Sequence, residues 1–100
     1  NTKVIDLVLE LESWGIEVVL YDPWASVGQL EKQHERIVPN ISDLTDLDSI
    51  IVTVGHDEFR NLAPNDLKVM SRGPMPVLGD LKSIYGKSEL IQAGFTVFRL

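Results

Sequence analysis

Residues 49–54 read SIIVTV, a near-continuous run of apolar and mostly β-branched residues. Such a run predicts a strand that is buried on both faces, as in the parallel sheets of α/β proteins. The residues GHDEF follow directly, and Asp57 and Glu58 suit the first turn of a helix, where the helix dipole favours acidic side chains. The stretch therefore predicts a strand that leads into a helix.

The C-terminal part of the chain repeats this pattern. Residues 75–81 (MPVLGDL) and 95–100 (FTVFRL) predict two more strands. Helices are predicted at 64–71, which begins with a proline, and at 87–93, which is followed by a glycine. Alternating strands and helices predict right-handed crossovers and a mostly parallel sheet.

The N-terminal part has a less regular pattern. A helix is predicted from the first two residues to Trp14, with Gly15 as its left-handed C-cap, and then a strand at 16–21 that Asp22-Pro23 ends. Three shorter elements are predicted next: a weakly patterned helix at 26–34, an edge strand at 36–38, and a helical turn at 43–47 capped by Ser42. The predicted fold is α/β, a three-layer Rossmann-like domain with helices on both faces of the sheet.

Composition limits the classes of function. The chain has 100 residues, enough for one domain, and its net charge of −6 disfavours nucleic acid and anionic membranes as partners. It has no cysteine, which excludes disulfides, thiolate metal sites and a cysteine nucleophile, and which fits a cytoplasmic location. No apolar run is long enough to span a bilayer. The chain lacks an initiator Met, so we expect a fragment, with the first strand of the sheet before Asn1.

Polar residues that follow the predicted strands are the candidate site. In open α/β sheets, ligands bind beyond the carboxyl ends of the strands. The candidates there are Asp22, His56, Asp80, Lys82 and Tyr85. Because neighbouring side chains cannot converge on one ion, His56 and the two acids after it do not predict a metal site. With no glycine-rich phosphate loop and no complete catalytic set, the residues indicate a small-ligand or anion-binding module.

Each candidate also has a structural interpretation. Asp22 before a proline suits the start of a turn, and His56 could donate a hydrogen bond but has no evident partner to orient it as a base. Lys82 fits a solvated loop as well as a contact to phosphate or carboxylate. Tyr85 could contact a ligand or cover a helix end, and the sequence leaves both open.

Four blocks resemble one enzyme family. The segments NTKVIDLVLELESWGIEVVLYDPWA, VTVGHDEF, PVLGDLKSIY and AGFTVFRL are similar, in this order, to the C-terminal domain of the UDP-glucose/GDP-mannose dehydrogenases. The HDEF block and the Lys of DLK resemble the branch that oxidises UDP-N-acetylhexosamines. The resemblance implies that residues 1–100 are the single UDP-sugar-binding domain of a larger cytoplasmic enzyme that serves polysaccharide synthesis.

The resemblance also implies the chemistry. Such enzymes oxidise C6 of a nucleotide sugar to a carboxylate in two NAD-dependent steps, and an N-terminal Rossmann domain binds NAD and carries the catalytic cysteine. A central helix forms the homodimer, so the expected partners are UDP-sugar and the other domains of the polypeptide. Lys82 matches the basic position that contacts the UDP-sugar, and Asp80 is expected to position its loop. Because this chain has no cysteine, we expect no catalytic residue in it and no activity alone.

Two other functions stay open on sequence. A receiver-like phosphoacceptor domain would use Asp22 and Lys82, but the acidic pair that such domains need for Mg²⁺ does not follow the first strand. An interaction domain without a ligand of its own is the other alternative.

Overall fold

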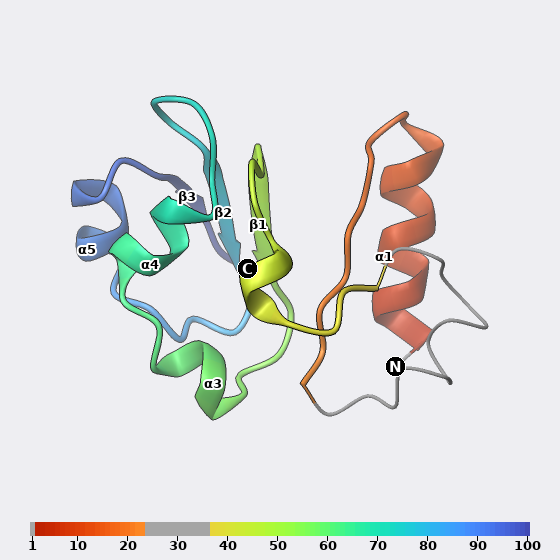
Figure 1. Ribbon diagram of the computed structural model, residues 1–100, viewed down its shortest axis with the longest axis horizontal. Coiled ribbons are helices and arrows are strands. Elements are labelled where there is room, and N and C mark those ends of the chain that lie inside the picture. Colours follow the sequence, from red (N-terminus) through yellow and green to blue (C-terminus); the bar gives the residue numbers. More distant parts are fainter. Residues whose placement is uncertain (1, 24–36) are drawn as a thin grey trace. The chain divides into compact units, whose positions relative to one another are not determined.

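The computed structural model describes residues 2–23 and 37–100, which fall into two compact units, Asn1–Leu44 and Thr45–Leu100. The helices are α1 (Thr2–Ser13), the 3-10 turn η1 (Ile41–Asp43), α3 (Asp57–Arg60), α4 (Pro64–Val69) and α5 (Lys87–Gln92), and the strands are β1 (Ser49–Val52), β2 (Val77–Asp80) and β3 (Thr96–Phe98) (Figure 1). Within these described residues, every helix is too short or too polar to cross a membrane.

The second unit is built on a parallel sheet in the order β1-β2-β3. Ile50 lies opposite Leu78, and Leu78 lies opposite Val97, so these three side chains share one face of the sheet. Because both crossovers step in the same direction along the sheet, right-handed connections carry α4 and α5 over the same face, as Figure 1 shows. The predicted α/β class, with a parallel sheet and flanking helices, is confirmed. Helices on both faces of the sheet stay a prediction, because α4 and α5 share one face and α1 belongs to the other unit.

The hydrophobic core of this unit lies between the sheet and its helices. Leu78 from β2 and Leu90 from α5 are completely buried. Burying such a side chain contributes about 1.5–3 kcal/mol relative to leaving it in water. The buried members of the core are Val52, Leu67, Leu78, Tyr85, Leu90 and Phe95.

The predicted helices of this unit are confirmed with small changes at their ends. α4 begins with its proline, and the Asp66 carboxylate accepts a hydrogen bond of 2.8 Å from the N–H of Ala63, which has no partner within the helix. Gly94 follows α5 with a φ of 104°, the left-handed conformation that a glycine adopts without strain. Asp57 and Glu58 lie in the first turn of α3, as predicted.

A close approach between two strands requires a glycine at position 79. Gly79 pairs with Phe98, and a Cβ atom at position 79 would lie 2.4 Å from the Cζ atom of Phe98. We expect Gly79→Ala to lower the free energy of unfolding by about 1 kcal/mol, because the half-exposed Phe98 ring must move aside. Urea denaturation measures this loss. The double variant Gly79→Ala/Phe98→Leu should be less destabilised than the sum of its single changes, and an unchanged Gly79→Ala protein would contradict the close approach.

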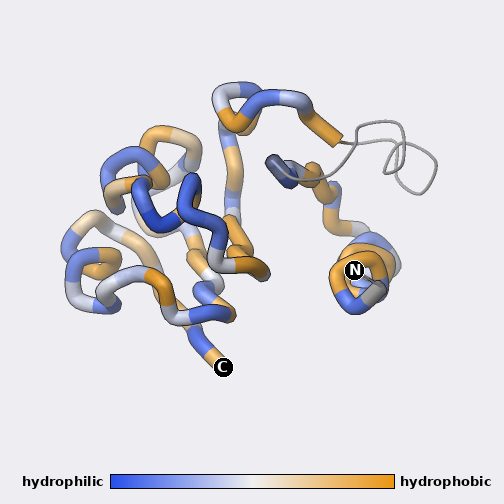
Figure 2. Tube along the Cα trace, turned by 90° about the horizontal axis from the view of Figure 1, so that it is seen from below, coloured by the Kyte–Doolittle hydropathy of each residue, from blue (hydrophilic) through white to orange (hydrophobic). Residues whose placement is uncertain are grey.

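The first unit contains the predicted N-terminal helix. α1 ends at Ser13, and Gly15 has a φ of 84°, which confirms the left-handed C-cap. Hydrophobic and hydrophilic residues both occur along α1 (Figure 2), and Val8 is buried whereas its neighbour Leu9 is exposed. This pattern is that of an amphipathic helix.

The predicted strand at 16–21 is wrong. Within the described residues, this segment makes only an isolated parallel bridge, between Leu20 and Ile37, and Ile16 and Val19 are exposed. Branched residues favour strands because they fit a half-buried pleated surface, so without a longer ladder their preference does not make a strand. Of the edge strand predicted at 36–38, the described residues 37 and 38 form this bridge and no longer ladder. Residue 36 and the helix predicted at 26–34 lie outside the described residues.

The helical turn predicted at 43–47 is also wrong. The turn η1 lies earlier, and the Asp43 carboxylate accepts a hydrogen bond of 3.2 Å from the N–H of Asn40 at its start, so Ser42 lies inside the turn and does not cap it. Asp46 has a φ of 54°, a left-handed conformation that no helix through 47 could contain.

Candidate functional site

The three strands end at one side of the sheet, beyond Val52, Asp80 and Phe98, which we call the carboxyl edge. The residues that follow the strands there are the GHDEF segment after β1, the Lys82 loop (residues 81–86) after β2, and Arg99 after β3. Within the second unit, the parallel sheet therefore brings His56, Asp80, Lys82 and Tyr85 to the same edge, as predicted.

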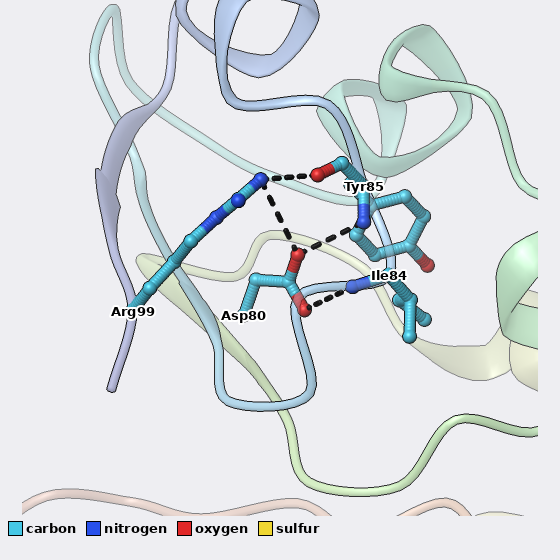
Figure 3. A network of polar contacts seen from close by, with 4 residues as sticks. All are labelled: Asp80, Ile84, Tyr85 and Arg99. Atoms are coloured by element: carbon cyan, nitrogen blue, oxygen red, sulfur yellow. Dashed lines mark hydrogen bonds and ion pairs between the residues drawn. The ribbon is translucent and has the colours of Figure 1, made fainter.

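Asp80 organises the Lys82 loop. Its side chain is 0% exposed, and its two oxygens accept hydrogen bonds of 3.0 Å from the N–H of Ile84 and 2.9 Å from the N–H of Tyr85 (Figure 3). One buried carboxylate thus joins the end of β2 to the far side of the loop. A buried charge needs such donors, because burial without them would cost several kcal/mol, by an order-of-magnitude estimate.

Arg99 completes this network from the neighbouring strand. Its Nη2 atom donates a hydrogen bond to the carbonyl oxygen of Tyr85 and lies 3.9 Å from Oδ2 of Asp80 (Figure 3). The Arg99 side chain is 29% exposed, and its buried Nε–H has no acceptor among the described residues. Arg99 was not among the residues predicted from sequence, although a cation directly after the last apolar strand is a signal that points to it.

Tyr85 faces the protein interior. The residue is 8% exposed, and its hydroxyl donates a hydrogen bond of 2.6 Å to the carbonyl oxygen of Phe59 in α3. Burial, with a smaller contribution from the negative charge of Asp80, raises the pKa of Tyr85 to about 12. Because ring and hydroxyl are both engaged within the domain, the geometry favours a structural role over the predicted contact to a ligand.

Lys82 is the exposed cation of the loop. Among the residues that the structure describes, none makes a hydrogen bond or an ion pair with its ammonium group. The next residue, Ser83, has a φ of 53°, and its N–H donates a hydrogen bond of 3.3 Å to the carbonyl oxygen of Asp80. Lys82 therefore extends from a backbone that is held on both sides.

Arg60, which directly follows the GHDEF segment, is a second exposed cation near the carboxyl edge. His56 precedes α3, and its ring centroid lies 5.7 Å from that of Phe59. Arg60 folds back, and its Nε donates a hydrogen bond of 2.9 Å to the carbonyl oxygen of Gly55. In residues 2–23 and 37–100, no three histidine, aspartate or glutamate side chains come together as a possible metal site.

Asp22 belongs to the first unit, where it is exposed in the segment after the Leu20 bridge. Its predicted proximity to Asp80 and Lys82 stays a prediction. The described part of the carboxyl edge thus offers exposed cations on an ordered backbone. This arrangement can bind an anion by charge-assisted hydrogen bonds.

Comparison with known proteins agrees with this chemistry. The family model described as the UDP binding domain of the UDP-glucose/GDP-mannose dehydrogenase family matches residues 1–87. The chain is 31% identical over 84 residues to a UDP-N-acetyl-D-glucosamine 6-dehydrogenase of Salmonella typhi, covering 84% of this chain and 20% of that protein. It is 34% identical over 91 residues to the Pseudomonas aeruginosa protein of the same name, covering 89% of this chain and 21% of that one.

A solved structure has a similar fold. The NDP-N-acetyl-D-galactosaminuronic acid dehydrogenase of Methanosarcina mazei Go1 matches with a TM-score of 0.71 and 25% sequence identity, over 94% of this chain and 18% of that one. The chain therefore spans about a fifth of the length of the relatives that it matches. The matched family is not one of phosphoacceptor domains, so the receiver-like alternative gains no support.

Proposed function

Because the chain belongs to the UDP-glucose/GDP-mannose dehydrogenase family, as its UDP binding domain, we propose that it helps to bind the nucleotide of a UDP-sugar in an NAD-dependent 6-dehydrogenase. The family match over residues 1–87 carries this proposal. The substrate is proposed to be a UDP-N-acetylhexosamine, since two relatives that are 31% and 34% identical bear the name UDP-N-acetyl-D-glucosamine 6-dehydrogenase.

Lys82 is the proposed contact to the UDP group. A diphosphate needs cations that reach it without first losing a competing partner, and Lys82 is exposed on a loop whose backbone Asp80 holds. An ammonium group placed in this way supplies a charge-assisted hydrogen bond to a phosphate oxygen. The fixed loop backbone also lowers the entropy that ordering the site would otherwise cost on binding.

The other parts of the reaction are proposed to belong to other domains of the same polypeptide. NAD supplies hydride acceptance in both oxidation steps, and this chain has no glycine-rich strand-to-helix turn to hold its pyrophosphate. A thioester intermediate would require a cysteine, and the chain has none. We therefore propose that this domain binds substrate without taking part in the chemistry, in a cytoplasmic homodimeric enzyme.

Replacing Lys82 tests the proposed function. In the complete encoded polypeptide, Lys82→Ala should raise the KM for UDP-N-acetylglucosamine about tenfold, because one charge-assisted hydrogen bond is lost. The KM for NAD should stay within about twofold, since a single phosphate contact on UDP does not touch the cofactor. Steady-state kinetics with each substrate varied in turn measures both values.

Two variants serve as controls for this test. Lys82→Arg keeps a cation at the same position and should recover most of the affinity. Arg72→Met removes an exposed cation whose partner, Asp48, precedes β1 at the opposite edge of the sheet, and should leave both KM values unchanged. Unaltered UDP-sugar kinetics in Lys82→Ala would contradict the assignment.

A further inference from the structure

We infer that Arg99 is a positioning residue for the UDP-sugar site, because it fixes the loop that carries Lys82. This inference rests on the proposed role of Lys82. Arg99 itself lies 17 residues away along the chain, directly after β3, and reaches the loop only because β3 pairs with β2.

The contacts of Arg99 close the loop at both ends. Asp80 stands where the loop begins, and Tyr85 stands near its end. The single Nη2 atom of Arg99 approaches both, as a donor to the Tyr85 carbonyl oxygen and as the cation 3.9 Å from the Asp80 carboxylate. Figure 3 shows Asp80 between Arg99 and the backbone of residues 84 and 85, so that β2, β3 and the loop meet at one carboxylate.

The loop needs this support because its backbone is not in a relaxed conformation. Ser83, next to Lys82, has a φ of 53°, which a residue with a Cβ adopts at a cost of roughly 1 kcal/mol. If Arg99 is removed, the carbonyl of Tyr85 and the carboxylate of Asp80 lose their cation, and other loop conformations become competitive. A displacement of about 1 Å in a binding group is enough to weaken its contact substantially.

Charge gives Arg99 a second effect on the same site. The Asp80 carboxylate lies two residues from Lys82 and would repel a diphosphate if its charge were not balanced. Arg99 provides the opposite charge at 3.9 Å. Because the charges of Asp80 and Arg99 offset each other, the positive charge of Lys82 is the main charge that an anion encounters at this loop.

A lysine should replace Arg99 in part. Both contacts of Arg99 run through Nη2, whereas its Nε–H has no acceptor among the described residues. One ammonium group can therefore stand in for the atom that does the positioning, although with less rigid geometry than a planar guanidinium. Arg99→Met keeps most of the aliphatic side chain and removes the cation.

Calorimetric titration of UDP into the complete encoded polypeptide tests the inference. Arg99→Met should weaken the Kd for UDP about fivefold, and Arg99→Lys should restore it to within about twofold of the parent. In a Lys82→Ala background, Arg99→Met should change the Kd by less than about twofold, because the group that it positions is already absent. The exposed pair Arg72–Asp48 provides the matched control, and Arg72→Met should leave the Kd unchanged.

The outcomes separate the two proposals. If Lys82→Ala leaves the Kd for UDP unchanged, the proposed function of Lys82 fails, and the inference on Arg99 fails with it. If Lys82→Ala weakens binding but Arg99→Met does not, only the inference is overturned. Equal effects of Arg99→Met in both backgrounds would also overturn it, since they would mean that Arg99 acts independently of Lys82.

A separate measurement covers the case in which Arg99→Met does not fold. Hydrogen exchange of the Ile84 and Tyr85 amides, which donate to Asp80, reports the loop directly in Arg99→Gln, which removes the cation and keeps a polar side chain. We expect faster exchange at these two amides than in the parent, with the amides of α4 unchanged. Unchanged exchange at both amides, together with an unchanged Kd, would overturn the inference.

Discussion

Asp80→Ala is expected to lower the free energy of unfolding by about 3–5 kcal/mol, a large part of the roughly 5–15 kcal/mol that holds a domain of this size together. The Asp80 side chain is 0% exposed, so no water replaces the lost carboxylate. The N–H groups of Ile84 and Tyr85 lose their acceptor, and each buried unpaired donor costs about 1–3 kcal/mol. Urea denaturation followed by circular dichroism measures the loss.

A second aspartate–arginine pair provides the control for Asp80. Asp48 accepts hydrogen bonds of 2.7 and 2.9 Å from Arg72, and the hydrogen bond to Arg72 lowers the pKa of Asp48. Both side chains are exposed, so water replaces the lost contacts and Asp48→Ala should be far less destabilising than Asp80→Ala. Equal losses from the two substitutions would contradict the importance of burial at Asp80.

Asp80→Asn separates the shape of this residue from its charge. The amide keeps one acceptor oxygen for a backbone N–H but offers an NH₂ group to the second N–H and to Arg99. We expect the free energy of unfolding of Asp80→Asn to lie between that of the parent and that of Asp80→Ala. The closer the stability of Asp80→Asn lies to that of Asp80→Ala, the more of the stabilisation by Asp80 comes from its negative charge, which Arg99 balances.

The sheet could be predicted from sequence because each of its strands is an apolar run with a polar end. Residues 49–54, 75–81 and 95–100 all contain a strand of the sheet, and the observed strands are shorter because the ladder, not the apolar run, sets their length. The segment 16–21 is also rich in branched residues, and among the described residues it forms only a bridge. A run of branched residues indicates that a strand can form, whereas its partners decide whether it does.

The candidate site was predictable only in part. The order of the strands places the Lys82 loop at the carboxyl edge, and this follows from the alternating pattern. The link between Asp80 and Arg99 depends on the register in which Gly79 lies opposite Phe98, and nothing local to either residue signals it. Tyr85 could not be assigned because a phenol suits both a ligand contact and a buried position with a single hydrogen bond.

Alkaline pH is expected to destabilise the domain through Tyr85. Burial, and then the charge of Asp80, raise the pKa of Tyr85 from 10.0 to about 12 in the folded protein. Below pH 10 the phenol is neutral in both states and the full stabilisation is present. Between pH 10 and 12 the unfolded chain ionises while the folded chain resists, so the free energy of unfolding should fall by about 2–3 kcal/mol.

Comparison with Tyr85→Phe isolates the contribution of Tyr85 to this titration. Other groups also titrate at high pH, so the measured quantity is the difference between the parent and Tyr85→Phe in urea denaturation at each pH. The free energy of unfolding of the parent minus that of Tyr85→Phe should fall by about 2–3 kcal/mol from pH 9 to pH 12. Ultraviolet titration gives an independent test: Asp80→Asn should lower the pKa of Tyr85, since it removes the negative charge that opposes phenolate formation. A Tyr85 phenol that ionises near pH 10 in the folded protein would contradict the buried, hydrogen-bonded position of its hydroxyl.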